Sequence, residues 1–464
     1  MFFSRFRDCC EAIKLVASAA EIFMNRSLAW RDRSIKRIDK ALEIAPRFYL
    51  AWFMRGVIVA RVALYKKSRE MVWEAVENFN RAYDPEASRN WPHKYRPFLA
   101  KGKLFYRFAM YEDALREFSR AIELADDVDP NEIFLRKSLA LYNLGRFREC
   151  VEVAMPTLKP IHDDELIRLA GEHANLYRLS EEEAKAVACK AISEILIRNL
   201  DEAEKTVEWM LSRAETPEAL ALQVSVLQAR GDRNYAMQVF SRIPEGERPI
   251  EALLAVWRLY KGEGDYVSAL RFIEEALDRI PNSIGLRWLR CNTLLRIKGR
   301  SREAEECYRD LVEECGGRRY FFCQMAAYDL AVRLMREGRF EEAEKYFKLA
   351  MEMMQYPHSD TYFHYAYMLE KIPGRLDEAL EYYKLAARYG EFPLRFGSCA
   401  SVFEDYGLYK EALVNYFKAI TEQIGSGPMH PLFRKKDWGG LKAMIKIIRR
   451  SGGDCCDVIE MIGL

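Results

Sequence analysis

Apolar residues at the N-terminus recur with the three- and four-residue spacing of an amphipathic helix. The apolar face would consist of Ile13, Leu15, Val16, Ala19, Ala20 and Phe23. A signal peptide is the other interpretation, because two arginines precede this apolar stretch. The charges of Glu11, Lys14 and Glu21 interrupt it, however, so we predict an amphipathic helix over residues 1–24.

Further along the chain, one helical pattern is repeated. Its clearest copy consists of Gly102, Ala114, Phe118 and Ala121. The same spacing returns as Ala331, Ala343, Phe347 and Ala350, and again as Ala400, Ala412, Tyr416 and Ala419. Small residues at three of the four positions let neighbouring helices approach closely, and the aromatic residue fills the space between them. We therefore expect most of the aromatic residues to belong to the packed interior.

This pattern resembles the tetratricopeptide repeat, a helix–turn–helix unit of about 34 residues. Trp52 and Gly56 match the opening of the family's first helix, and Pro46 and Pro281 match its final proline. The small residue of the second helix marks eleven units, at Ser34, Ala75, Ala114, Cys150, Ala203, Ala236, Ala269, Ala304, Ala343, Ala379 and Ala412. The resemblance covers residues 13–426. It implies an all-α, right-handed superhelical solenoid with about eleven repeats and a short basic C-terminal cap.

Three segments depart from the repeat. About seven residues are added near positions 65–72, and we expect them to bulge at a turn. Residues 84–96 form a proline-bounded loop, and an extra helical segment is predicted over Asp164–Arg178. The predicted organisation is N-terminal repeats over 1–165, a degenerate helical junction over 166–182, C-terminal repeats over 183–426 and a basic capping segment over 427–464.

Charge is nearly balanced over the 464 residues, with 72 Lys and Arg against 70 Asp and Glu. This balance argues against a general polyanion binder, which needs a broad excess of cations. A local basic patch is nevertheless predicted from Arg89, Lys94, Arg96, Arg434, Lys435, Lys436, Lys442, Lys446, Arg449 and Arg450. The C-terminal part of this patch could simply cap the solenoid, or it could also bind an acidic partner, RNA or an anionic membrane.

The cysteine pattern favours reduced thiols. There are eleven cysteines, an odd number, and most lie within helical patterns. We expect buried free thiols at Cys150, Cys291, Cys307, Cys323 and Cys399, and hence a cytoplasmic chain. The adjacent pairs 9–10 and 455–456 near the two ends remain unexplained. No run approaches the roughly 18 apolar residues of a membrane-spanning helix.

No constellation of residues with catalytic chemistry emerges. The six histidines lack metal-ligand spacing, and the loops that bind phosphates or carry nucleophiles are absent from the sequence. Carboxylates fall among Lys and Arg on helix faces, where pairing four residues apart explains them. We therefore predict no catalytic, cofactor-binding or metal site, and no enzymatic activity.

The resemblance implies that the first helices of successive units line a concave groove for a partner protein segment. The inward positions would be Phe53, Leu99, Lys103, Tyr106, Leu135, Tyr142, Trp288, Asn292, Tyr328, Phe363 and Tyr367. The predicted function is a non-enzymatic protein–protein interaction scaffold or adaptor. Two alternatives remain open. One is an RNA- or ribonucleoprotein-binding solenoid that uses the basic segments 89–96 and 434–450, and the other is a regulatory or assembly subunit of an enzyme complex.

Overall fold

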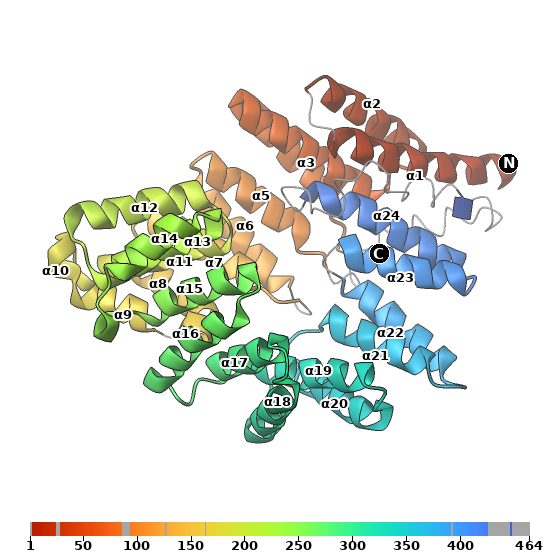
Figure 1. Ribbon diagram of the computed structural model, residues 1–464. Coiled ribbons are helices and arrows are strands. Elements are labelled where there is room, and N and C mark those ends of the chain that lie inside the picture. Colours follow the sequence, from red (N-terminus) through yellow and green to blue (C-terminus); the bar gives the residue numbers. More distant parts are fainter. Residues whose placement is uncertain are drawn as a thin grey trace. The chain divides into compact units, whose positions relative to one another are not determined.

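The computed structural model describes residues 2–24, 28–85, 93–125, 128–162, 164–390, 393–425 and 446–447. Over these residues the chain forms α-helices and no strand. The predicted all-α fold is therefore confirmed (Figure 1).

Consecutive helices are paired as helix–turn–helix units. The eleven pairs are α1 (Phe2–Met24) with α2 (Leu28–Ile44), α3 (Tyr49–Lys66) with α4 (Arg69–Arg81), α5 (Arg96–Arg107) with α6 (Tyr111–Glu123), α7 (Asn131–Asn143) with α8 (Phe147–His162), α11 (Glu181–Leu196) with α12 (Leu200–Arg213), α13 (Pro217–Arg230) with α14 (Arg233–Ser241), α15 (Ile250–Glu263) with α16 (Tyr266–Arg279), α17 (Ile284–Arg296) with α18 (Ser301–Cys315), α19 (Phe321–Arg336) with α20 (Phe340–Glu352), α21 (Ser359–Glu370) with α22 (Leu376–Arg388), and α23 (Pro393–Asp405) with α24 (Tyr409–Gly425). Two short helices, α9 (Glu165–Glu172) and α10 (Ala174–Tyr177), lie between the fourth and fifth pairs.

The small residue that marks each predicted unit is fully buried in all eleven second helices. In nine of them it is the fourth residue of the helix; α2 and α4 begin three residues earlier. A small side chain at this position lets the second helix approach its neighbours closely, while the adjoining aromatic residue fills the interior. The repeat predicted from the sequence is thus confirmed as a TPR-like series of helix pairs.

The helices divide into two compact units. The terminal unit comprises Met1–Val128 and Tyr356–Leu464, and the central unit comprises Asp129–Gln355. The predicted junction over 166–182 falls inside the central unit instead of between two units. The reason is that α9 and α10 pack onto α11, as part of the same body.

The terminal unit brings together the first and last helix pairs of the chain. Figure 1 shows α24 beside α1, and these two helices are in contact. The rings of Phe48 and Phe417, both fully buried, stack with their centroids 5.6 Å apart. Of the predicted basic cap over 427–464, only residues 446–447 are described, so the capping prediction lies largely outside the described residues.

The cysteine prediction needs correction. Cys291 is disulfide-bonded to Cys307, with a Cα–Cα distance of 5.5 Å, and Cys315 is bonded to Cys323, with 5.8 Å. The antiparallel packing of α17, α18 and α19 creates these short distances, which residue spacing alone did not reveal. Cys9 and Cys10 each take part in a disulfide bond as well. Three cysteines, at 150, 189 and 399, are buried free thiols, as predicted for the first and the last of them.

The turn of the second helix pair is tight. The extra residues near 65–72 do not bulge as a loop, because only Lys67 and Ser68 separate α3 from α4. They lengthen the two helices instead. Among the described helices, none has the length and the low charge content of a membrane-spanning helix.

Candidate interaction surface

The predicted groove residues are divided between the two units. The terminal unit contains Phe53, Leu99, Lys103, Tyr106, Phe363 and Tyr367, and the central unit contains Leu135, Tyr142, Trp288, Asn292 and Tyr328. Three of these side chains are buried: Leu99, Leu135 and Tyr328, at 8%, 5% and 9% exposure. They therefore contribute to helix packing instead of an open surface. Tyr367, at 40%, is the most exposed of the eleven.

Aromatic groove residues of the terminal unit pack between helices. The ring of Phe53 on α3 contacts Phe79 on α4, with centroids 5.7 Å apart. The guanidinium carbon of Arg395 lies 3.9 Å from the ring centroid of Phe363 on α21. Cation–π contacts of this kind hold neighbouring pairs together. One face of each ring packs against a neighbouring helix, and only the rest of the ring is accessible.

The central part of the predicted groove is occupied by the chain itself. A carboxylate oxygen of Glu165, at the start of α9, accepts a hydrogen bond from the backbone N–H of Ile250 at 2.8 Å, and Glu165 also pairs with Arg279. The hydroxyl of Tyr177 on α10 donates to Glu218 on α13 at 2.7 Å. Consequently α9 lies against the N-terminal end of α15, and α10 lies against the N-terminal end of α13.

The sequences of α13 and α15 indicate that other helices cover them. Nine residues of each helix, distributed around its circumference, are buried. The segments 217–227 and 250–259 are correspondingly rich in apolar residues around the helix, with Glu218 and Glu251 among the few charges. A helix stretch with apolar residues around most of its circumference is covered on most of its faces. No predicted groove residue lies on α11, α13 or α15, and the predicted residues Trp288 and Asn292 of the central unit lie further along, on α17.

Two predicted residues on α17 converge on a carboxylate that the sequence analysis missed. The indole Nε1 of Trp288 donates to Asp329 Oδ2 at 2.8 Å, and the amide of Asn292 also donates to Asp329. Burial raises the pKa of Asp329 to about 6, against the opposing effect of these hydrogen bonds. The ring of Trp288 also packs on Phe322, with centroids 5.5 Å apart. The signal in the sequence was a single carboxylate within an otherwise apolar stretch of α19.

Cations occupy the C-terminal ends of three successive first helices, and two of them, Arg296 and Arg336, act on the carboxylate of Asp329. Lys261 lies near the C-terminus of α15, Arg296 lies at the C-terminus of α17, and Arg336 lies at the C-terminus of α19. All three side chains are exposed. Burial and repulsion from Arg296 and Arg258 lower the pKa of Lys261. Among the described residues, neither Arg296 nor Arg336 forms an ion pair. Helix dipoles favour cations at these ends, and their positive potential stays available to a ligand. We call Lys261, Arg296, Asp329, Arg336 and Trp288 the α15–α19 surface.

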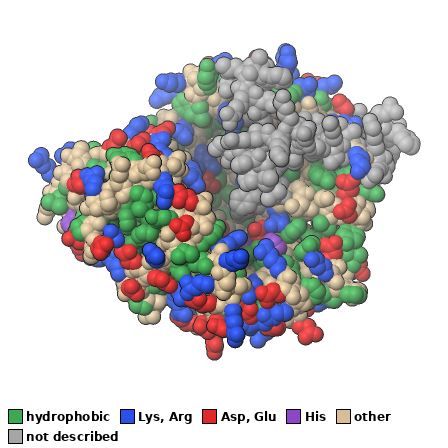
Figure 2. All heavy atoms as spheres, viewed as in Figure 1, with side chains coloured by type: hydrophobic (Ala, Val, Ile, Leu, Met, Phe, Trp, Pro, Cys, Tyr) green, Lys and Arg blue, Asp and Glu red, His purple; other side chains and the backbone are tan. Residues whose placement is uncertain are grey.

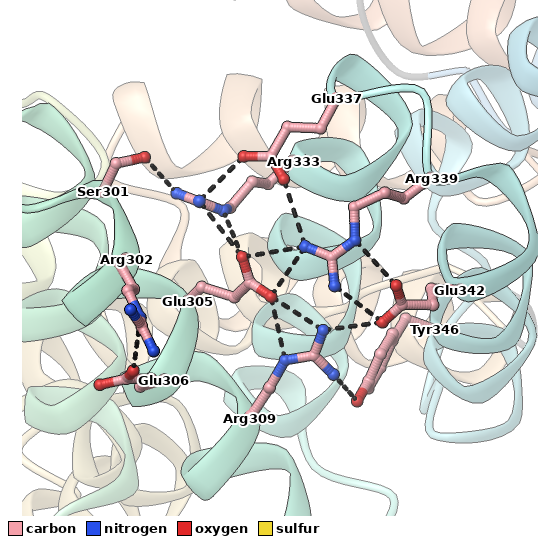
Figure 3. A network of polar contacts seen from close by, with 10 residues as sticks. All are labelled: Ser301, Arg302, Glu305, Glu306, Arg309, Arg333, Glu337, Arg339, Glu342 and Tyr346. Atoms are coloured by element: carbon pink, nitrogen blue, oxygen red, sulfur yellow. Dashed lines mark hydrogen bonds and ion pairs between the residues drawn. The ribbon is translucent and has the colours of Figure 1, made fainter.

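A network of ion pairs joins α18, α19 and α20 (Figure 3). Glu305 on α18 pairs with Arg309, Arg333 and Arg339 at 2.8, 3.2 and 3.0 Å. Burial acts to raise the pKa of Glu305, but the hydrogen bonds from Arg309 and Arg339 outweigh it and the pKa is lowered. Together with the two disulfides, these contacts join α17, α18, α19 and α20 into a rigid support for the surface.

The predicted basic patch is described only at Lys94, Arg96 and Lys446, and its other members lie outside the described residues. Lys446 Nζ lies 2.9 Å from Glu404 Oε1, so its charge is already paired. Over the described side chains drawn in Figure 2, positive and negative residues are intermingled. In the described part of the chain, no three His, Cys, Asp or Glu side chains are arranged to hold a metal ion.

No family model matches the chain, and no curated protein sequence matches it. Solved structures with a similar helical architecture include a dimer of human IFIT1 with PPP-AAAA, 14% identical over 88% of this chain and 94% of that one, with a TM-score of 0.42. Yeast Tom70 is 13% identical over 94% and 99% of the two chains, also with a TM-score of 0.42. The APC/C hetero-tetramer Cut9–Hcn1 is 12% identical over 93% of each, with a TM-score of 0.36. At this level of similarity, no binding property passes from those proteins to this chain.

Proposed function

We propose that this chain is a non-enzymatic scaffold that holds a segment of a partner protein on the α15–α19 surface. One observation carries the proposal: Trp288, Asn292 and Asp329 converge beside cations that no carboxylate of the described chain neutralises by an ion pair. Unpaired cations around a fixed polar centre favour an oppositely charged ligand. The surface also rests on a braced support, which limits the entropy lost on binding.

The chemistry of the surface specifies what the partner segment should contain. Carboxylate side chains would pair with Arg296 and Arg336, and an apolar side chain would contact the accessible part of the Trp288 ring. Asp329 disfavours a second carboxylate close to it once it is ionised, which spaces the partner's acidic residues away from the centre. An acidic segment with one apolar anchor is therefore the expected ligand.

RNA binding and a role as a regulatory subunit of an enzyme complex remain the alternatives. RNA would also be attracted by cations, but single-stranded bases need exposed aromatic faces for stacking. Trp288 packs on Phe322 and uses its Nε1 within the fold, which favours a protein segment over RNA. A regulatory subunit would be recognised by a catalytic chain that co-purifies with it in constant ratio.

The test is selection from a random-peptide display library with the full chain as bait. We expect selected peptides to be enriched in Asp and Glu and to lose at least ten-fold in affinity for the Arg296→Glu/Arg336→Glu variant. The matched control is Arg271→Glu/Arg318→Glu, which makes the same charge change at two exposed positions elsewhere in the central unit. Equal affinity for both variants would overturn the proposal. Salt-sensitive binding of a single-stranded RNA oligonucleotide that the first variant abolishes would support the RNA alternative instead.

A further inference from the structure

The second helix pair is longer than its neighbour at one end. Gly56 on α3 and Gly102 on α5 occupy equivalent places, because each backs onto the aromatic ring of its own second helix, Phe79 or Phe118. Nineteen positions separate Gly56 from the small residue Ala75, against twelve between Gly102 and Ala114. The second pair therefore carries seven additional residues around its turn.

These residues extend both helices beyond the neighbouring pair. Helix α3 continues ten residues past Gly56, whereas α5 continues five past Gly102. Helix α4 also starts six residues before its small residue, against three for α6. At 1.5 Å per residue the turn projects by roughly 5–7 Å beyond that of the next pair. The extension is ordered helix, since Val62 and Ala63 within it are buried. We call residues 64–73 the α3–α4 tip.

Large apolar side chains are exposed on the tip. Leu64 is 39% exposed, Tyr65 64% and Trp73 56%. Leu64 and Tyr65 lie within two residues of the end of α3, and Trp73 lies about one turn into α4. Trp73 is held in position by Phe105 of the next pair, with ring centroids 5.8 Å apart. Stacking of the helix pairs does not require these exposed side chains, because the α5–α6 pair stacks without the extra residues at its turn.

The same tip is basic. Lys66, Lys67 and Arg69 are exposed, and among the described residues none of them forms an ion pair. Glu70 is the one carboxylate in the tip segment. Lys67, the C-cap of α3, has a positive φ of 51°, a left-handed backbone conformation that favours glycine over lysine. The helix dipole of α3 accounts for the cations at Lys66 and at its C-cap Lys67, but not for Arg69, the first residue of α4.

We propose that the α3–α4 tip docks onto an anionic lipid surface. Trp and Tyr rings partition to the boundary between headgroups and acyl chains, and leucine can enter the apolar layer beneath them. Lysine and arginine beside them are attracted to anionic headgroups. The tip projects beyond the turn of the next pair, so its exposed rings and cations can meet a planar surface together. This contact is peripheral and reversible, because the tip offers few apolar side chains and no spanning helix.

Vesicle co-sedimentation with the full chain tests the proposal. We expect binding to vesicles of phosphatidylserine and phosphatidylcholine, little binding to phosphatidylcholine alone, and a fall in binding as salt is raised. The Tyr65→Ser/Trp73→Ser variant should bind at least five-fold more weakly, whereas Tyr235→Ser, at an exposed tyrosine in the central unit, should bind as the wild type does. Blue-shifted tryptophan fluorescence on vesicle addition, lost in Trp73→Phe, would localise the contact.

Charge-reversal variants test the role of the basic residues of the tip independently of its aromatic residues. Lys66→Glu/Lys67→Glu should abolish the phosphatidylserine dependence, while Lys298→Glu/Arg318→Glu, with the same net change at exposed residues of the central unit, should not. Absence of vesicle binding by the wild type would overturn the proposal. So would a shift from dimer to monomer in the tip variants, which would identify the tip as a contact between two copies. The arginine variants of the α15–α19 surface should bind vesicles normally, so this proposal and the proposed function fail separately.

Discussion

The backbone of Gly102 lies directly against the ring of Phe118, and a Cβ atom at position 102 would come within 2.5 Å of that ring. Gly56 has the same relationship to Phe79, at 2.7 Å. Both rings are buried, so they cannot turn into solvent to make room. In these two pairs the absent side chain of the first helix is what allows the aromatic residue of the second helix to fill the interior.

Gly102→Ala is therefore expected to destabilise the protein by about 1–3 kcal/mol, through overpacking against Phe118. Urea denaturation measures the effect. Gly262→Ala is the matched control, because a Cβ on this glycine of α15 would meet no atom within 4 Å. Alanine there should be neutral or stabilise by up to about 1 kcal/mol, owing to its better helix propensity. If both substitutions had the same effect, the close approach at position 102 would not be limiting.

Reduction of the disulfides should loosen the central unit. The bond between Cys291 and Cys307 spans 16 residues, and loop entropy then predicts a stabilisation of about 3 kcal/mol. Cys291→Ala/Cys307→Ala should lower the unfolding midpoint of oxidised protein. Measuring the unfolding midpoint of both proteins with and without a phosphine reductant shows whether loss of the disulfide is the cause. The reductant should cost the variant less stability than it costs the wild type, and an equal loss in both would contradict the assigned pairing.

Asp329 should make stability depend on pH between about 4 and 6. Its pKa of about 6 in the folded state exceeds the value of about 3.9 expected for an unfolded chain, so folding binds a proton in this interval. The free energy of unfolding then falls as pH rises through it. Asp329→Asn should stabilise the protein by about 1 kcal/mol at pH 7 and have little effect at pH 4. Urea titrations at both pH values measure this, with the exposed Asp278→Asn as a control expected to show no such difference.

Glu342 should act in the opposite direction at low pH. Hydrogen bonds from Arg339 and Arg309 lower its pKa to about 2, below the value for an unfolded chain, so its contribution exists above about pH 4.3 and disappears as pH falls towards 2. Glu342→Gln should lower the urea midpoint at pH 7 and have a much smaller effect at pH 2.5, where most of the contribution is lost. The neighbouring Glu341→Gln, at an exposed residue, is the control. The same pH-dependent loss in both variants would show that general surface charge is responsible.

The regular part of the fold could be predicted from the sequence because it depends on local spacing. Twelve residues from small to small and four from small to aromatic fix which residues of a helix pair face each other, whatever lies beyond the pair. For this reason the eleven marker residues from Ser34 to Ala412 are all buried. The extra helices between Cys150 and Ala203 were predictable on the same ground, since their helical periodicity is local too.

The candidate site was only partly predictable. Trp288 and Asn292 could be placed on one face of a first helix by their four-residue spacing, but Asp329 reaches them from a helix about forty residues away. Leu99, Leu135 and Tyr328 were placed in the groove and are buried, because a small rotation of a helix exchanges groove and core positions. The function of all these residues in binding stays a prediction.

The sequence by itself determined the helix pairs, their number and their interiors, since each pair is specified by residues within a few helical turns. Only the tertiary structure decided that Cys291 and Cys307 form a disulfide, that α1 meets α24, and that α9 and α10 cover the inner helices of the central unit. These relationships join residues far apart in the chain or depend on the angle between successive pairs. Small differences at each turn add up along a stack, and no local pattern encodes their sum.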